Sequence, residues 1–160
     1  GQPVTGRYRY TLGVADSQDY SKIGEYKYKT PPNGISVEIE NVKFSTDPAK
    51  GTFRVLISND YHLLAKEPDY DYSDLFELRS IDNIIDDTTQ FPLPPPSLIR
   101  LQLVDPTRTA LSSDSLLTKP PVLAQWGQGY GDELIIFFYY TSPSDDHRIN
   151  VDITSMGPCK

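Results

Sequence analysis

The sequence is poor in the residue types that build catalytic and metal-binding sites. Its 160 residues include one cysteine, one methionine, one tryptophan and two histidines. The lone Cys159 excludes a disulfide within the chain. No apolar run approaches the ~18 residues that a membrane-spanning helix needs, and the longest, Leu134 to Tyr140, has the length of a strand. Disulfide-stapled and membrane-inserted folds are therefore not expected.

Sequence motifs of hydrolytic enzymes are also missing. The chain has no Gly-x-Ser-x-Gly elbow and no His-Glu-x-x-His segment. A hydrolase would need His62 or His147 beside a carboxylate in a cleft, with Ser112 or Ser113 as a nucleophile within reach of the base. Nothing in the sequence brings these residues together, so we do not expect an enzyme.

The negative charge is concentrated in one part of the chain. The net charge is −7, from 15 basic and 22 acidic residues. All of the excess lies between Asp60 and Asp87, where Lys66 and Arg79 are the only bases. Nucleic acids and anionic membranes attract clustered lysine and arginine, so neither is an expected partner.

Alternating apolar and polar residues dominate what the chain does contain. A period of two is typical of half-buried strands, and 14 prolines argue against long helices. We predict an all-β fold, an antiparallel, jelly-roll-like β-sandwich of about eight strands. The expected strands are 7–12, 25–29, 35–40 continuing through Val42 and Phe44, 52–58, 98–104, 133–140 and 148–153.

Turn-forming residues separate these strands. Pro31-Pro32-Asn33-Gly34 and the segment 47–51 are expected to be hairpin connections, and the segment 142–146 is expected to join the last two strands. The pairs Tyr8/Tyr10 and Tyr26/Tyr28 form same-face stripes, which predict cross-strand packing on neighbouring strands. The alternative for these tyrosines is an exposed contact surface.

Two segments have a less regular pattern. The segment from Asp60 to Asp87 fits a strand, a loop or a short helix; a strand would point Phe76 and Leu78 inward. The segment from Thr107 to Leu123 predicts a long ordered loop, with apolar anchors at Leu111, Leu116, Leu117, Val122 and Leu123.

The length suits a single domain spanning residues 1–160, with 1–5 and 155–160 as loose tails. The chain starts at Gly1 without methionine or a signal-like segment, which indicates a processed form with Gly1 as a tag remnant.

The stretch from Leu101 to Trp126 carries a recognisable pattern. It resembles a group of secreted bacterial β-proteins of unknown function, often tagged with a C-terminal PEP-CTERM sorting signal. In this group a strand is followed by Asp-x-Thr-x-Thr-Ala-Leu-Ser-Ser-Asp-x-Leu-Pro and then Pro-Pro. The matching residues are Asp105, Thr107, Thr109, Ala110, Leu111, Ser112, Ser113, Asp114, Leu116, Pro120 and Pro121, while Leu117-Thr118 replaces the expected proline. Residues 6–10 and 57–61 are similar to the same group. The resemblance implies a secreted sandwich and no particular activity.

The acidic run Asp69-Tyr70-Asp71-Tyr72-Ser73-Asp74 is a candidate calcium site. Carboxylates at alternate positions of a loop can converge on Ca²⁺, which prefers several oxygen ligands. We name Asp69, Asp71 and Asp74 as candidate ligands, although the spacing fails as an EF-hand. The alternative is a solvated acidic edge that discourages strand pairing.

A candidate ligand site lies in the cluster Trp126-Gly127-Gln128-Gly129-Tyr130-Gly131. Trp126 and Tyr130 on a glycine-rich loop have the chemistry to stack on a sugar ring. The alternative, which we favour, places Trp126 in the core beneath the long loop, because large aromatic side chains dominate core burial.

These observations favour a non-enzymatic structural or interaction domain that acts extracellularly or at the cell surface. The alternative is a carbohydrate- or calcium-binding module, with Ca²⁺ as the only expected cofactor. Cell-surface polysaccharides and proteins are the expected classes of partner; nucleic acid and membrane insertion are not expected.

Overall fold

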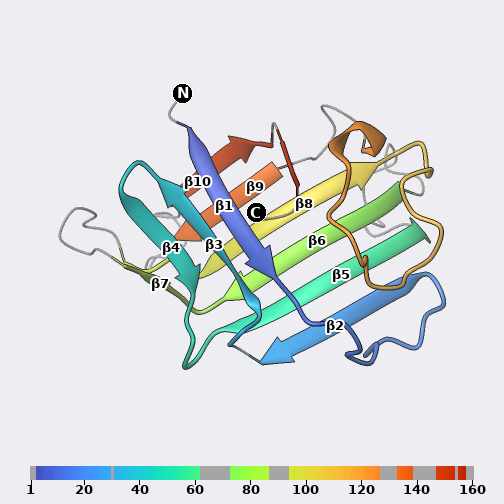
Figure 1. Ribbon diagram of the computed structural model, residues 1–160, viewed down its shortest axis with the longest axis horizontal. Coiled ribbons are helices and arrows are strands. Elements are labelled where there is room, and N and C mark those ends of the chain that lie inside the picture. The colour runs from blue at the N-terminus through green and yellow to red at the C-terminus, as the bar shows by residue number, and fades with distance from the viewer. Residues whose placement is uncertain are drawn as a thin grey trace.

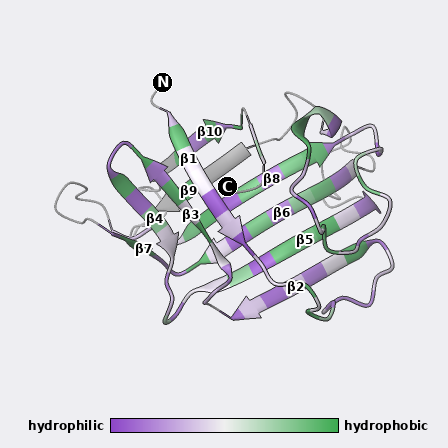
Figure 2. Ribbon diagram, in the orientation of Figure 1, coloured by the Kyte–Doolittle hydropathy of each residue, from purple (hydrophilic) through white to green (hydrophobic). Residues whose placement is uncertain are grey.

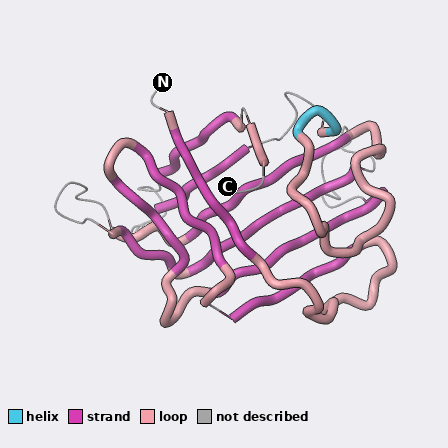
Figure 3. The backbone as a smooth tube through the Cα atoms, viewed as in Figure 1, coloured by secondary structure: helices cyan, strands magenta, loops and turns pink. Residues whose placement is uncertain are grey.

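The computed structural model describes residues 3–29, 31–61, 73–86, 94–126, 133–138, 147–153 and 155–157. Ten strands and one short 3₁₀ helix make up the regular structure of these residues (Figures 1 and 3). The strands are β1 (Val4–Arg9), β2 (Ile23–Lys29), β3 (Gly34–Ile39), β4 (Val42–Thr46), β5 (Thr52–Tyr61), β6 (Ser73–Ile81), β7 (Asn83–Ile85), β8 (Leu98–Asp105), β9 (Glu133–Phe138) and β10 (His147–Asp152); the helix is η1 (Leu123–Gln125).

Two antiparallel sheets form the two layers of the molecule. One has four strands in the order β1-β3-β4-β7, and the other has six in the order β10-β9-β8-β6-β5-β2. The four-stranded sheet lies in front of one half of the larger sheet in Figure 1. This arrangement confirms the predicted all-β antiparallel sandwich. No helix in the described part of the chain is long and apolar enough to cross a membrane.

The strand count exceeds the expected eight because two turns are hidden in the apolar pattern. Glu40 ends β3 and Asp82 separates β6 from β7, and both residues adopt a left-handed backbone (φ 56° and 58°). The single strand expected over 35–44 is therefore wrong: the inward positions change from odd-numbered residues to even-numbered ones at the turn, where β3 and β4 form a hairpin.

The core lies between the sheets and follows the alternation of the strands. Val37 and Phe44 come from the four-stranded sheet, and both are buried. The larger sheet contributes buried side chains from its five best-packed strands: Tyr26, Tyr28, Phe53, Val55, Ile57, Phe76, Leu78, Ile99, Leu101, Leu103 and Ile136. Apolar residues concentrate along β5, β6 and β8 (Figure 2). Phe76 and Leu78 point inward, as predicted for a strand in this segment.

Residues 106–126, which follow β8, cover the half of the larger sheet that the smaller sheet leaves bare (Figures 1 and 3). Leu111 is buried, and Leu116, Leu117 and Leu123 pack against the core. Val122 is 58% exposed, so its predicted role as an anchor is wrong. The loop is otherwise ordered and anchored as the sequence indicated.

Two predicted hairpins instead carry the chain from one sheet to the other. The segment 31–34 joins β2, which pairs with β5, to β3, which pairs with β1. The segment 47–51 likewise joins β4 to β5 in the opposite sheet. The turn residues were recognised correctly, but turn chemistry alone does not determine which strands pair. The last two strands, β9 and β10, pair antiparallel; the segment 142–146, which was predicted to join them, lies outside the described residues.

The tyrosine pairs meet across the sandwich and not within one sheet. The rings of Tyr10 and Tyr28 lie 6.2 Å apart, and those of Tyr8 and Tyr10 stack at 6.0 Å. Because β1 and β2 belong to facing sheets, the predicted cross-strand pairing is wrong. The Tyr10 hydroxyl donates a 2.7 Å hydrogen bond to the carbonyl of Leu117 and so ties the long loop to this cluster.

Candidate functional site

A buried carboxylate shapes the start of the long loop. Asp105, the last residue of β8, is 1% exposed. Its Oδ1 accepts hydrogen bonds from the Thr107 amide (2.8 Å) and hydroxyl (2.6 Å). Its Oδ2 accepts from the amides of Thr109 (2.8 Å) and Ala110 (3.0 Å). The Asp-x-Thr-x-Thr-Ala pattern therefore has a structural reason: one carboxylate satisfies three amides of the turn that follows it.

These hydrogen bonds also keep Asp105 ionised. Burial by itself raises the pKa of this carboxyl, but the donors of Thr107, Thr109 and Ala110 outweigh it and lower the pKa below its ordinary value. The negative charge of Asp105 is thus stabilised by the backbone amides that donate hydrogen bonds to it.

Asp74, a candidate calcium ligand, is a second buried carboxylate beside the first. It lies fully buried in β6, directly opposite Asp105 in the sheet register. Its Oδ1 accepts from the amide of Asp60 (3.0 Å), at a register shift in β5, and its Oδ2 accepts from the amide of Leu111 (2.8 Å). Burial raises the pKa of Asp74, and the nearby Asp60 and Asp105 raise it further. Each carboxylate oxygen of Asp74 therefore accepts a hydrogen bond from a backbone amide of another segment.

The structure does not test the other two candidate calcium ligands. Asp69 and Asp71 lie outside the described residues. Where the structure is described, no three side chains of the His, Cys, Asp and Glu types gather as a metal site would require. Calcium binding through Asp69 and Asp71 stays a prediction.

Trp126 lies in the core under the long loop. It is 3% exposed, and its ring centroid is 6.4 Å from that of Phe76. This is the position that the sequence favoured over sugar stacking, and it leaves no open ring face for a sugar. Tyr130 lies outside the described residues.

The residues considered for hydrolysis are not brought together in the described structure. Ser112 and Ser113 are exposed on the long loop. His62 lies outside the described residues, and of His147 only the backbone, at the start of β10, is described. A hydrolytic site built on either histidine therefore stays an untested alternative.

A groove that sequence reasoning missed opens beside β1. It has a volume of about 580 Å³ and lies between β1 and residues 151–153 and 155–157, at and beyond the end of β10. Leu101 of the larger sheet and Val37 of the smaller sheet contribute apolar wall, as do Val151, Ile153 and Met156. This volume falls within the ~300–1,000 Å³ of typical ligand sites. We call this cavity the β1 groove.

The β1 groove borders an open sheet edge. In the described residues β1 is the terminal strand of its sheet and pairs with β3 alone. At the opposite edge of the same sheet, β7 has only three residues. At the β2 edge of the larger sheet, the Ser17 amide donates to the carbonyl of Glu25 (2.9 Å), and the Glu25 amide donates to Asp16 Oδ1 (2.9 Å). Shortening and covering are ordinary ways to protect an edge, and within the described part of the chain β1 has neither.

A sequence signal for this site was Gly6 within the strand β1. Glycine inside a strand often marks a place where another backbone or a ligand approaches closely. Val4 and Thr5 also pair with β3, so the loose tail expected over residues 1–5 ends before Val4.

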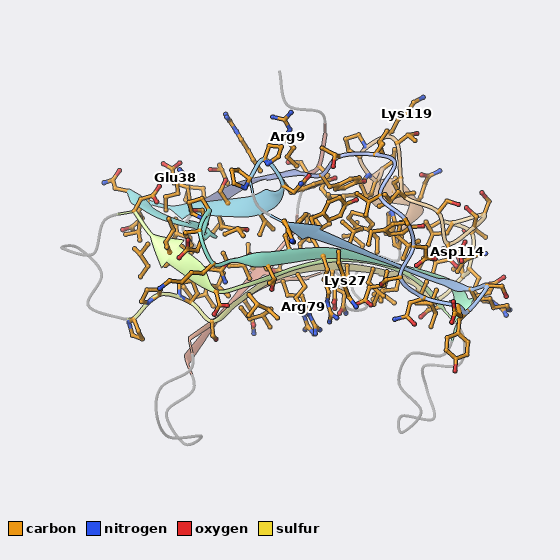
Figure 4. The ribbon with its side chains drawn as sticks, turned by 90° about the horizontal axis from the view of Figure 1, so that it is seen from below. Arg9, Lys27, Glu38, Arg79, Asp114 and Lys119 are labelled. Atoms are coloured by element: carbon orange, nitrogen blue, oxygen red, sulfur yellow. The ribbon has the colours of Figure 1, made fainter. Side chains whose placement is uncertain are left out.

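The outer face of the larger sheet carries a row of basic side chains, part of whose charge two glutamates balance. Lys27, Arg54, Arg79 and Arg100 stand opposite one another on four adjacent strands, and Lys27 and Arg79 point away from the molecule in Figure 4. Glu25 lies between the first two, with its carboxylate oxygens 2.9 Å from Lys27 Nζ and 2.8 Å from Arg54 Nη1.

Arg79 pairs with Glu77 in the same way, at 3.1 Å. The pKa of Glu25 reflects two opposing effects: burial raises it, but the donors of Lys27, Gln18, Ser17 and Arg54 lower it to about 2. Glu25 and Glu77 therefore balance part of the charge of the four basic residues on this face.

Comparison of the chain with protein-family models, with curated proteins and with solved structures finds no match.

Proposed function

We propose that the protein is a non-enzymatic interaction domain that acts outside the cytoplasm and binds a partner in the β1 groove. The observation that carries this proposal is the coincidence of an apolar groove with a sheet edge that the described residues leave unpaired. A sheet edge offers backbone donors and acceptors, and the groove offers pockets for side chains. Together they suit an extended protein segment better than a flat polysaccharide, which binds through exposed polar and aromatic groups.

The lining of the groove argues against catalysis at this place. Its ionisable residues among the described ones are Arg7, Tyr8 and Asp152. General acid–base catalysis draws on histidine or on paired carboxylates whose pKa values differ, and neither arrangement is present in this lining. The extracellular location rests on the resemblance of residues 101–126 to secreted bacterial proteins.

Filling the groove tests this function. Ser155 lines the groove and is exposed, so Ser155→Trp should occupy the cavity while leaving β1 intact. Ser112→Trp, on the exposed surface of the long loop, is the matched control.

The readout is a two-dimensional amide NMR titration with a panel of extended peptides and with oligosaccharides. We expect peptides to shift the amides of β1 and residues 151–157 in the wild type and in Ser112→Trp, but not in Ser155→Trp. Shifts confined to other surfaces, or a response to oligosaccharides alone, would overturn the proposal.

A further inference from the structure

The outward face of β1 carries positive charge that the sheet does not balance. Arg7 and Arg9 are exposed, and in the register with β3 they stand opposite Ser36 and Gly34. The acidic residue of β3, Glu38, stands opposite Thr5 on one side and Lys43 on the other. Figure 4 shows Arg9 pointing away from the molecule on the side of the smaller sheet. Neither arginine has an acidic residue opposite it in β3. A strand added at the open edge of β1 could supply acidic cross-strand partners for both.

The inward face of β1 has a complementary gap. Val4, Gly6 and Tyr8 alternate with the outward residues and line the β1 groove. A Cβ at Gly6 would lie 3.2 Å from the Ser36 carbonyl oxygen, so this position is held without a side chain by the close backbone of β3. A bulky apolar side chain on an adjacent strand can cover such a glycine. It would rest against Val37 and Leu101, which line the same groove.

We propose that β1 receives an extended segment of a partner protein as an added strand, with apolar side chains entering the β1 groove and acidic side chains facing Arg7 and Arg9. This inference rests on the proposed function and specifies the partner. Alternate residues of an edge strand direct their N–H and C=O groups away from the paired strand, so main-chain hydrogen bonds supply binding. The alternating side chains supply selectivity.

The charges disfavour a second copy of the chain as the occupant. Consider β1 paired antiparallel with β1 of another molecule, in a register in which the two strands overlap along most of their length. Arg7 and Arg9 would then lie beside the same two arginines of the other copy. Like charges directly opposite one another destabilise a strand pair. An acidic and apolar segment meets no such repulsion.

The probe for this proposal is a synthetic heptapeptide of alternating valine and glutamate. Two comparison peptides isolate its features: valine alternating with lysine reverses the charge, and serine alternating with glutamate removes the apolar side chains. Binding is measured by titration calorimetry at low and at physiological salt, and the site is located by hydrogen exchange of the β1 amides.

We expect the valine–glutamate peptide to bind at least tenfold more tightly than either comparison peptide and to slow exchange of β1 amides. The double variant Arg7→Glu with Arg9→Glu should transfer the preference to the valine–lysine peptide. Lys50→Glu, which reverses an exposed charge in the turn between β4 and β5, should keep the original preference. A general loss of stability would weaken the binding of both peptides. It would not reverse the preference between the valine–glutamate and the valine–lysine peptide.

Each other outcome has a definite meaning. Equal binding of the two charged peptides at β1 would overturn the acidic partner but leave the proposed function standing. Binding without protection of β1 amides would overturn strand addition. Concentration-dependent dimerisation in analytical ultracentrifugation, abolished in the double variant, would assign the edge to a second copy and also overturn this inference.

Discussion

Glu25 should contribute a pH-dependent part of the stability. Its side chain is 6% exposed and bridges Lys27 and Arg54 on the outer face of the larger sheet. The pKa of Glu25 falls from 4.5 to about 2 in the folded protein. Because one pKa unit corresponds to about 1.4 kcal/mol, ionised Glu25 stabilises the fold by up to about 3 kcal/mol relative to its protonated form. Glu25→Gln keeps the shape and removes the charge, so we expect a loss of about 2–3 kcal/mol at neutral pH.

The assay is urea unfolding of both proteins between pH 7 and pH 2.5. A carboxyl whose pKa is lower in the folded state stabilises the fold fully at pH values above its unfolded pKa. That contribution disappears as the pH falls from about 4.5 towards 2. The gap between wild type and Glu25→Gln should therefore be constant above pH 5 and shrink steadily below it. A gap of the same size at pH 3 and pH 7 would refute the reasoning. Glu38→Gln, on the exposed face of β3, is the control and should change stability by less than about 0.5 kcal/mol.

Three further predictions concern the loop, the core and the metal hypothesis. Asp105→Ala leaves three turn amides without their acceptor, so urea unfolding should show a loss of about 3–5 kcal/mol; a loss below 1 kcal/mol would mean that the carboxylate does not organise the loop. Phe76→Ala removes a fully buried ring and should cost about 3–5 kcal/mol in the same assay. If Asp69 and Asp71 bind Ca²⁺, excess calcium should raise the melting temperature by several degrees, and the rise should vanish in Asp69→Ala with Asp71→Ala; identical melting curves in calcium and chelator would end the calcium hypothesis.

The alternation of apolar residues was sufficient to predict the layers but not their connections. Phe53, Val55 and Ile57 all point into the core, as a period of two requires. The segment 31–34 has the residues of a tight turn, yet it crosses between sheets, because pairing depends on contacts made far along the chain. Tyr10 and Tyr28 illustrate the same limit, since their contact joins residues from opposite layers.

The functional residues were harder to predict than the core, for two physical reasons. The carboxylate of Asp74 looks like a metal ligand in the sequence, but in the structure it accepts backbone amides from two distant segments. The β1 groove is formed by residues 4–8, 35, 37, 101, 120, 151–153 and 155–157, which come together only when the sandwich closes. Gly6 was its one local sign, and a single glycine in a strand has several explanations.

The central claim is that an extended partner segment binds along β1. Hydrogen exchange of the β1 amides, measured with a saturating valine–glutamate heptapeptide in the wild type and in Ser155→Trp, tests it most directly. We predict that the peptide slows exchange of alternate β1 amides in the wild type and has no effect on them in Ser155→Trp. Exchange at β1 that is unchanged by the peptide in the wild type, while the peptide is bound elsewhere, would contradict the claim.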